Sequence, residues 1–309
     1  MKIRIGTRGS QLALWQAFHV QNKLEEAGIS TEIVTIETKG DKILDVSIAK
    51  IGSKGVFTEE IEEQLANGSI DIAVHSAKDM QSSLPDGFEL IAFMEREEVN
   101  DVIVSHRSGI SLDSEDLVLG TSSTRRIATL RHFYPNIKTV PVRGNLQTRI
   151  RKMEEGDCDA LLLAYAGVHR MGYDDKIKTK LSLDEFIPAV GQGSVAIEVH
   201  KKLEADKRAR ITQVLNHEPT AYCLRSERAF LKTMDGGCSI PVFGLAQLNN
   251  EQIHLQGGII SLDGTQRILK EKTGGINSAE QLGEQLANEV LSSGGKEILE
   301  EIKNRLNHE

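Results

Sequence analysis

Short runs of aliphatic and β-branched residues alternate with amphipathic segments along the first two thirds of the chain. Such runs are typical of buried strands, and apolar residues spaced three and four apart are typical of helices that cover a sheet. The predicted strands are residues 3–5, 33–38, 70–75, 90–94, 102–105, 118–120, 139–142 and 160–164. The predicted helices between them are residues 11–27, 58–67, 125–132 and 146–155. This alternation favours an α/β fold with largely parallel sheets covered on both faces.

The last third of the chain has a different order of elements. Helical patterns at residues 203–216 and 220–234 precede three strand-like runs, and two further helices follow them. The runs lie near residues 243–248, 253–261 and 267–273, and the helices near 279–291 and 296–307. Strands in succession followed by helices favour a separate α+β unit. The charged residues 95–100 and the Pro- and Gly-containing residues 188–193 are the predicted crossings between the first two units.

Composition narrows the class of protein. A chain of 309 residues is long enough for two or three domains, and its apolar content of 39% is normal for a globular protein. No apolar run approaches the roughly 20 residues that cross a bilayer. The first residues, MKIRIGTRGS, contain no secretory apolar region. We therefore expect a cytoplasmic protein with no membrane partner.

Charge, cysteine and histidine exclude further classes. The net charge of −8 argues against a nucleic-acid partner, because phosphate backbones select broad positive surfaces. The three cysteines, Cys158, Cys223 and Cys238, form no CxxC pair, and their odd number fits poorly with a disulfide framework. The nine histidines show no HxxxH spacing, so we expect no metal site.

Polar clusters that contain Arg or Lys follow five or six of the predicted strands. In doubly wound sheets, ligands bind beyond the carboxyl ends of the strands. The clusters are residues 7–10, 39–41, 75–79, 121–126 and 143–145, with Arg149 and Arg170 further along. Arg offers a planar fork of donors to carboxylates or phosphates, and a helix start near residues 121–123 also favours an anion. The sequence therefore predicts a cleft for a small molecule with several negative charges.

These residues leave alternative interpretations open. Each Arg could instead pair with one of the 45 acidic residues. Asp79 could cap a helix or pair with Lys78, or it could handle protons and stabilise a developing cation. Cys238 follows two glycines in a tight loop, where an accessible thiol becomes a nucleophile if cations lower its pKa. Cys158 and Cys223 are expected to be structural.

Two glycine-containing segments have no standard phosphate or dinucleotide spacing. The loop at residues 50–57 carries Lys50 and Lys54, which can cover an anion, but it lacks the GxxxxGK[ST] pattern. The segment Gly191-Gln-Gly193 precedes a strand rather than opening a helix, so it is not a GxGxxG motif.

The chain resembles the porphobilinogen deaminase (hydroxymethylbilane synthase) family through nine motifs in order. They are TRGSQLALWQA, TKGD, AKIGSKGVFTEE, DIAVHSAKDM, GTSSTRR, VRGNLQTR, PAVGQG, SERAFL and GGCSIP, spread along nearly the whole chain. The resemblance implies three domains: residues 1–95 with 190–214, residues 96–189, and residues 215–309. The first two would be doubly wound sheets similar to type II periplasmic binding proteins. The third would be a small α+β unit with an antiparallel three-stranded sheet.

The resemblance also implies a reaction and a covalent cofactor. A dipyrromethane, attached to Cys238 through a thioether, primes the synthesis and stays on the enzyme. Four porphobilinogen molecules are deaminated and joined one at a time, and hydrolysis releases hydroxymethylbilane. The protein would then be a monomeric transferase of porphyrin and haem biosynthesis. Residues 41–57 would be mobile, because they must admit substrate and shield intermediates.

Individual residues carry over from the family motifs. Asp79 matches the catalytic aspartate, which is thought to contact the pyrrole N–H groups and assist loss of ammonia through an azafulvene-like cation. The implied cofactor-binding residues are Ser76, Lys78, Asp79, Thr121, Ser122, Ser123, Arg125, Arg126, Arg143, Gly144 and Cys238. The implied substrate-binding residues are Arg8, Ser10, Lys50, Lys54, Phe57, Arg149, Arg170, Gln192 and Arg228. Each pyrrole brings an acetate and a propionate, which accounts for the number of cations.

Some positions depart from the family pattern. Ser239 follows the cysteine where Gln is common, and Gln81 replaces a Pro. The pair Thr58-Glu59 stands where Val-Lys is frequent, and residues 97–100 lack a usual Pro-Arg. None of these changes removes a residue assigned to the chemistry.

Two other classes of function remain as alternatives. A non-catalytic anion-binding protein can share this fold, and it would need neither Asp79 nor Cys238. A thiol-dependent acyl-transfer enzyme would need a histidine that activates Cys238. His75 is the nearest motif candidate, although we expect it to be a packing or hydrogen-bonding residue at a strand end.

Overall fold

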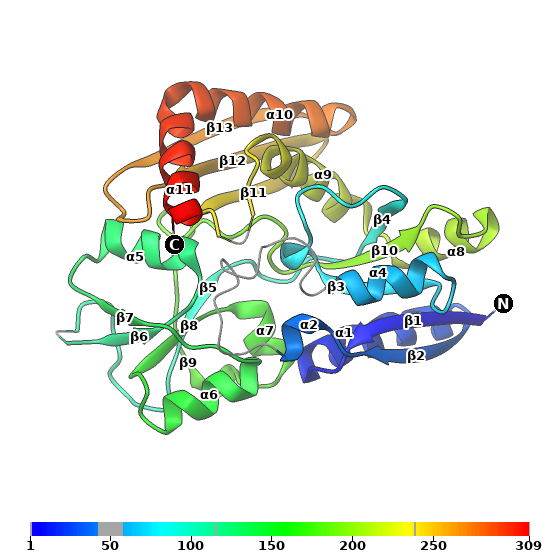
Figure 1. The fold of residues 1–309 in the computed structure, drawn as a ribbon, viewed down its shortest axis with the longest axis horizontal. Coiled ribbons are helices and arrows are strands. Elements are labelled where there is room, and N and C mark those ends of the chain that lie inside the picture. The colour runs from blue at the N-terminus through cyan, green and yellow to red at the C-terminus, as the bar shows by residue number, and fades with distance from the viewer. Residues whose placement is uncertain (1, 43–57, 115, 238, 309) are drawn as a thin grey trace.

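The computed structural model describes residues 2–42, 58–114, 116–237 and 239–308. Its strands form two five-stranded sheets and a separate three-stranded sheet, each packed against helices (Figure 1). This arrangement confirms the predicted α/β class with a distinct α+β unit. Within the described residues, no helix is long and apolar enough to span a bilayer.

The first sheet has the order β2-β1-β3-β10-β4. Its strands are β1 (Lys2–Arg8), β2 (Ser30–Ile36), β3 (Ile72–Ser76), β4 (Phe88–Phe93) and β10 (Val195–His200). The helices beside it are α1 (Gln11–Glu26), α2 (Lys39–Lys42), α4 (Glu59–Ala66) and α8 (Ala205–Leu215). Successive residues of a strand point to opposite faces, so Ile72 and Val74 pack toward α1 and α8 while Ala73 packs toward α4.

The second sheet has the order β7-β6-β8-β5-β9. Its strands are β5 (Asp101–Val104), β6 (Val118–Gly120), β7 (Lys138–Val140), β8 (Ala160–Ala164) and β9 (Ile177–Lys180). The helices are α5 (Thr124–Phe133), α6 (Leu146–Glu154) and α7 (Tyr165–Arg170), with a short turn η2 (Asp174–Lys176). Met153 of α6 and Val168 of α7 pack on one face, and Leu130 of α5 packs on the other.

The chain crosses between these two sheets twice. It passes from β4 through residues 94–100 into β5, and returns from β9 through residues 181–194 into β10. These crossings contain the two predicted segments. In each sheet the arriving strand runs antiparallel to both of its neighbours. The prediction of largely parallel sheets is therefore wrong at β5 and β10, because only local strand–helix–strand connections impose the parallel direction.

The third unit contains β11 (Val242–Asn249), β12 (Gln252–Ile260) and β13 (Arg267–Gly275), which pair antiparallel. Its helical elements are α9 (Glu218–Thr233), α10 (Ala279–Val290), α11 (Lys296–His308) and the short turns η3 (Ile276–Ser278) and η4 (Leu291–Gly295). Gly283 lets α10 approach α9 closely, because a Cβ there would lie 2.1 Å from the Ser226 carbonyl oxygen. This packing fixes α9, which leads directly into the loop around position 238.

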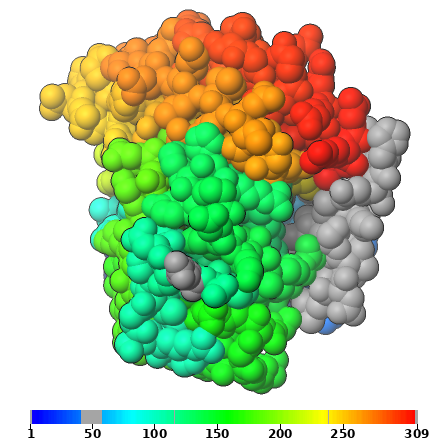
Figure 2. Space-filling view, turned by 90° about the vertical axis from the view of Figure 1, so that its left-hand side faces the viewer, coloured from blue at the N-terminus to red at the C-terminus, as the bar shows by residue number. Residues whose placement is uncertain are grey.

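The third unit rests on the second (Figure 2). Arg131 of α5 donates a hydrogen bond to the Leu262 carbonyl oxygen at 2.6 Å. The guanidinium of Arg267 lies 5.3 Å from the ring centre of Phe133 and 5.1 Å from that of Phe243. The C-terminal part of α5 therefore holds the third unit, while its N-terminus follows one of the polar strand ends.

Candidate active site

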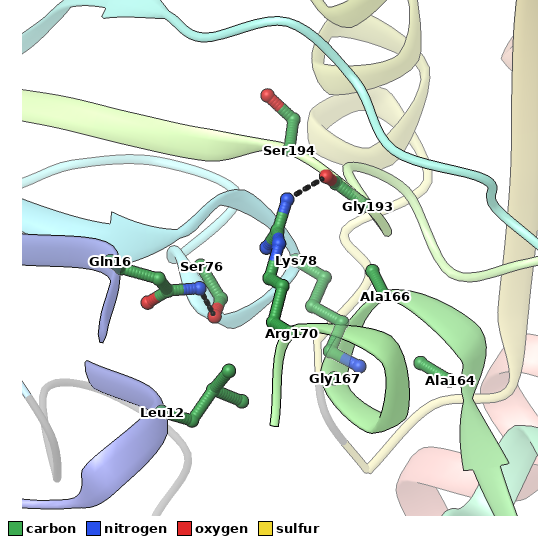
Figure 3. Close-up of a pocket in the computed structure, with 10 residues that line it drawn as sticks. All are labelled: Leu12, Gln16, Ser76, Lys78, Ala164, Ala166, Gly167, Arg170, Gly193 and Ser194. Atoms are coloured by element: carbon green, nitrogen blue, oxygen red, sulfur yellow. Dashed lines mark hydrogen bonds between the residues drawn. The ribbon is translucent and has the colours of Figure 1, made fainter. Parts of the chain in front are cut away.

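The polar strand ends of the first two sheets meet around a small cavity (Figure 3). Ser76, Lys78 and Gln16 of α1 line it from the first sheet, and Arg170 of α7 lines it from the second. Gln16 donates to the Ser76 hydroxyl at 2.9 Å, and Arg170 donates to the Gly193 carbonyl oxygen at 2.7 Å. The cavity therefore lies between the two sheets, where the sequence predicts a ligand cleft.

Helices begin directly at these strand ends because polar caps start them there. Ser10, Ser123 and Asn145 each accept a hydrogen bond from a backbone N–H in the first turn of α1, α5 and α6. Gly144 has a φ of +113°, and a Cβ there would lie 2.6 Å from the Thr148 side chain. Only glycine fits this entry to α6, which places the residues around it beside the cleft.

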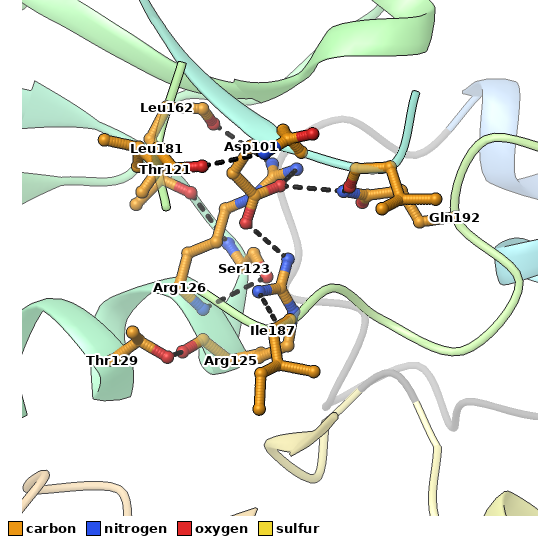
Figure 4. Close-up of polar contacts among 12 residues, drawn as sticks. Asp101, Thr121, Ser123, Arg125, Arg126, Thr129, Leu162, Leu181, Ile187 and Gln192 are labelled. Atoms are coloured by element: carbon orange, nitrogen blue, oxygen red, sulfur yellow. Dashed lines mark hydrogen bonds and ion pairs between the residues drawn. The ribbon is translucent and has the colours of Figure 1, made fainter. Parts of the chain in front are cut away.

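A buried carboxylate organises the second side of the cleft (Figure 4). Asp101, the first residue of β5, is 0% exposed. Its two oxygens accept hydrogen bonds from Arg125 at 2.8 Å and from Arg126 at 2.7 Å, and Gln192 donates to it at 3.0 Å. Each guanidinium also donates to a backbone carbonyl oxygen. Gln192 belongs to the return crossing, so Asp101 joins both crossings to the start of α5.

This cluster holds more positive charge than negative charge. Burial raises the pKa of Asp101, but the charges of Arg125 and Arg126 outweigh it and hold that pKa well below its usual range. The Nε atoms of both arginines are buried without a partner among the described residues. Burial, together with the charges of Arg126 and Arg125, lowers the pKa of Lys78 to about 8. A bound anion would offset this excess of positive charge.

Asp101 is the residue that sequence reasoning missed. Arg125 and Arg126 do pair with an acidic residue, as the alternative interpretation of the arginines states, but they share a single buried one. Its signal is an acidic residue placed directly before the apolar run at residues 102–104. A charge at the start of a buried strand is seldom left unpaired, so this position predicts a cationic partner.

The electrostatics of Arg149 indicate that the strand ends converge. Its Nε donates to the Gly144 carbonyl oxygen at 2.7 Å. Burial and the charges of Arg126 and Arg143 lower the pKa of Arg149, while the charge of Asp79 acts in the opposite direction. Asp79 follows the first sheet and the arginines follow the second. These groups therefore lie close enough to interact across the cleft.

Asp79 ends the short turn η1 (Ala77–Asp79) that follows β3. Its side chain is exposed, and within the described part of the chain its carboxylate makes no hydrogen bond or ion pair. The alternative pair with Lys78 is therefore not observed, and Lys78 lies 3.5 Å from the Gln192 side-chain oxygen instead. The Asp79 carboxylate is available to a ligand.

Other predicted residues contribute to the walls of the cleft or lie beyond it. Arg8 is half-buried at the end of β1, and Thr121 is buried. Ser122 donates to the Val142 carbonyl oxygen at 3.1 Å. Burial lowers the pKa of Arg228 in α9 to about 10. Lys50, Lys54, Phe57, Cys238 and all but the first two residues of the predicted mobile segment 41–57 lie outside the described residues.

The other candidate groups have structural environments. His75 is buried, and its Nε2 lies 2.9 Å from the Glu198 carboxylate, as expected for a hydrogen-bonding residue at a strand end. Cys158 and Cys223 are buried, and burial raises the pKa of both to about 11, which suits structural thiols. The described residues contain no cluster of His, Cys, Asp and Glu that could hold a metal ion.

Two solved structures share part of this arrangement. A domain of BvgS from Bordetella pertussis is 15% identical, covers 70% of this chain and 85% of its own, and has a TM-score of 0.42. The second substrate-binding domain of an amino acid ABC transporter from Streptococcus pneumoniae is 16% identical, covers 68% and 90%, and has a TM-score of 0.43.

Sequence comparison gives a closer likeness. Residues 3–208 match the family model described as porphobilinogen deaminase, dipyromethane cofactor binding domain, and residues 221–292 match the C-terminal domain of the same family. The porphobilinogen deaminase of Cytophaga hutchinsonii is 59% identical and that of Desulfosudis oleivorans 54% identical, each over 98% of both chains. With a cationic cleft that faces the free carboxylate of Asp79, these matches show that the chain belongs to the porphobilinogen deaminase family.

Proposed function

We propose that this protein is a transferase of tetrapyrrole biosynthesis that deaminates porphobilinogen and joins four molecules head to tail. A covalent dipyrromethane on Cys238 is the primer, and hydroxymethylbilane and ammonia are the products. The observation that carries the proposal is the convergence of the half-buried cations Lys78 and Arg149 on the unpaired carboxylate of Asp79, in a chain of this family.

Asp79 is assigned the chemical step. Each addition breaks the C–N bond of the aminomethyl group, and ammonia leaves while positive charge develops on the pyrrole ring. A C–C bond then forms to the free α-carbon of the growing chain, which loses a proton. A carboxylate at the pyrrole N–H stabilises the developing charge and can take up that proton. The dipyrromethane, when bound, supplies the first attacking carbon.

The cations are assigned to the acetate and propionate groups. The buried Nε atoms of Arg125, Arg126 and Arg170 have no partner in the described part of the chain, so the donor set fits a ligand with several carboxylates. We assign the cofactor to Ser76, Lys78, Thr121, Ser122, Ser123, Arg125, Arg126, Arg143 and Gly144. We assign the incoming substrate to Arg8, Ser10, Lys50, Lys54, Phe57, Arg149, Arg170, Gln192 and Arg228.

The proposal also covers the domain limits, the oligomeric state and the cellular location of the protein. We propose domain limits at residues 1–95 with 190–214, 96–189 and 215–309. The two sheets and their crossings support the first two, and the antiparallel sheet supports the third. We also propose that the protein acts as a monomer in the cytoplasm.

Turnover of porphobilinogen by the purified protein tests the proposal. Ammonia should appear in step with porphobilinogen consumption. Asp79→Asn should lower kcat by roughly 10²- to 10⁴-fold, the usual size of a lost acid–base contribution. Asp86→Asn, which changes another exposed carboxylate of the same segment, should keep the wild-type rate. Wild-type turnover by Asp79→Asn would refute the assignment of the chemical step.

A further inference from the structure

The segment that follows Asp79 is held by apolar packing of Met80 and Leu84 but has few polar attachments to the rest of the protein. Residues 81–84 lie outside helices and strands, and no backbone N–H among them is hydrogen-bonded to another backbone carbonyl of the described residues. The Asp79 carboxylate itself has no partner there. The position of this carboxylate therefore depends on how the backbone on either side of it is held. On the upstream side, β3 and η1 hold it.

Gln81 holds the downstream side through two contacts. Its carbonyl oxygen accepts a hydrogen bond from Arg228 of α9 at 2.8 Å. Its side-chain amide donates to the hydroxyl of Thr58 at 3.2 Å. These contacts come from two different units, because α9 belongs to the third unit and Thr58 precedes α4 on the first sheet.

Thr58 is well suited to act as a fixed anchor. It occupies the N-cap position of α4 and is 4% exposed, yet its hydroxyl makes no capping hydrogen bond. An N-cap threonine ordinarily accepts from the first turn of its own helix, whereas this hydroxyl accepts from Gln81 and also interacts with the Glu62 carboxylate. The helix behind it is firmly placed, since Ile61 and Leu65 are buried against the sheet.

We infer that Gln81 is a positioning residue for Asp79, held through the Gln81–Thr58 hydrogen bond. The bond ties the backbone two residues after the carboxylate to the rigid start of α4. Without it, the Arg228 contact still holds the Gln81 carbonyl, but the segment gains freedom to move along the cleft. Small displacements of a reacting group lower the rate of the chemical step more than they lower substrate affinity.

Paired variants test this inference, which rests on the proposed function. Gln81→Met and Thr58→Val each remove the hydrogen bond and keep a side chain of similar size. Each should lower kcat roughly two- to tenfold, the effect of one neutral hydrogen bond, and leave KM within about twofold. The double variant should be no slower than the slower single variant, because both changes remove the same bond. Thr58→Ser, which retains the hydroxyl, should restore kcat.

The chain offers a matched control. Gln21 of α1 donates to the Thr31 hydroxyl at 2.7 Å, so the same kind of bond occurs on the same unit away from the cleft. Gln21→Met should leave kcat unchanged. The intact mass of every variant should match that of the wild type after allowance for the substitution, which shows that the covalent cofactor is retained.

Several outcomes would overturn the role of Gln81. They are a wild-type kcat in both Gln81→Met and Thr58→Val, effects that multiply in the double variant, an equal loss in Gln21→Met, or a loss of rate that follows a loss of cofactor mass. A wild-type protein that consumes no porphobilinogen refutes the proposed function instead. An active wild type with unaffected variants refutes only the positioning role.

Discussion

The substitution Asp101→Asn tests the internal structure of the cleft most severely. Asp101 is fully buried and forms ion pairs of 2.8 Å and 2.7 Å with two guanidiniums. Asparagine keeps the size of the side chain but removes the charge, and its amide replaces one accepting oxygen with a donor. One guanidinium then faces a donor, and both lose the charge that offsets their burial.

The expected cost follows from this geometry. Removing one partner of a buried ion pair lowers the free energy of unfolding by about 3–5 kcal/mol, because the remaining charge stays desolvated. At about 2–4 °C per kcal/mol, the melting temperature should fall by roughly 6–20 °C. Arg126→Met in the Asp101→Asn background should recover part of this loss, since it removes one of the uncompensated charges.

Thermal unfolding followed by circular dichroism measures this effect. The matched control is Glu98→Gln. It breaks the ion pair between Glu98 and Lys180, whose side chains are 47% and 44% exposed. Exposed pairs contribute about 0–1 kcal/mol, so this variant should melt within a few degrees of the wild type. If Asp101→Asn melts as the wild type does, the two arginines are not held by Asp101 and the reasoning fails.

Two further predictions concern charge in and around the cleft. Because the pKa of Lys78 is lowered to about 8, its positive charge is lost as pH rises through that value. The cofactor carboxylates then lose one of their cations, so kcat should fall above pH 8. Lys78→Arg, which does not titrate there, should flatten this fall in kcat, and an unchanged pH profile in this variant would show that another group causes the fall. Glu227 is 0% exposed and accepts hydrogen bonds from Arg96 at 2.5 Å and 3.2 Å and from the Gly191 and Ala246 N–H groups at 2.8 Å. Glu227→Gln should therefore lower the free energy of unfolding by about 3–5 kcal/mol in chemical denaturation, and a loss below about 1 kcal/mol would contradict the account of this buried anchor.

Local patterns in the sequence predict most of the elements but not how they pair. The strands at residues 118–120 and 160–164 coincide with β6 and β8. Ser10, directly before the predicted helix at residues 11–27, caps α1. These features depend on neighbouring residues, through periodicity and capping. By contrast, α7 has only six residues and β9 is a charged edge strand, so neither has a long enough pattern to stand out.

The candidate site divides in the same way. Each cluster of Arg and Lys directly follows a strand, so it is visible in the sequence. The topology of a doubly wound fold then brings these strand ends together. The partner of Arg125 and Arg126 is not visible, since Asp101 lies 24 and 25 residues away and joins them only through the pairing of β5 with β8. The antiparallel pairing of β5 with β8 and β9, and of β10 with β3 and β4, is equally non-local. Both depend on the crossings between the sheets, which sequence periodicity does not specify.

The intact mass of the purified protein tests the central claim most directly. The account predicts a mass above that of the sequence by one covalent dipyrromethane. It also predicts that Cys238→Ser has the mass of its sequence alone and turns over no porphobilinogen. An unmodified wild-type protein with full activity, or a Cys238→Ser variant that keeps the added mass, would contradict the claim.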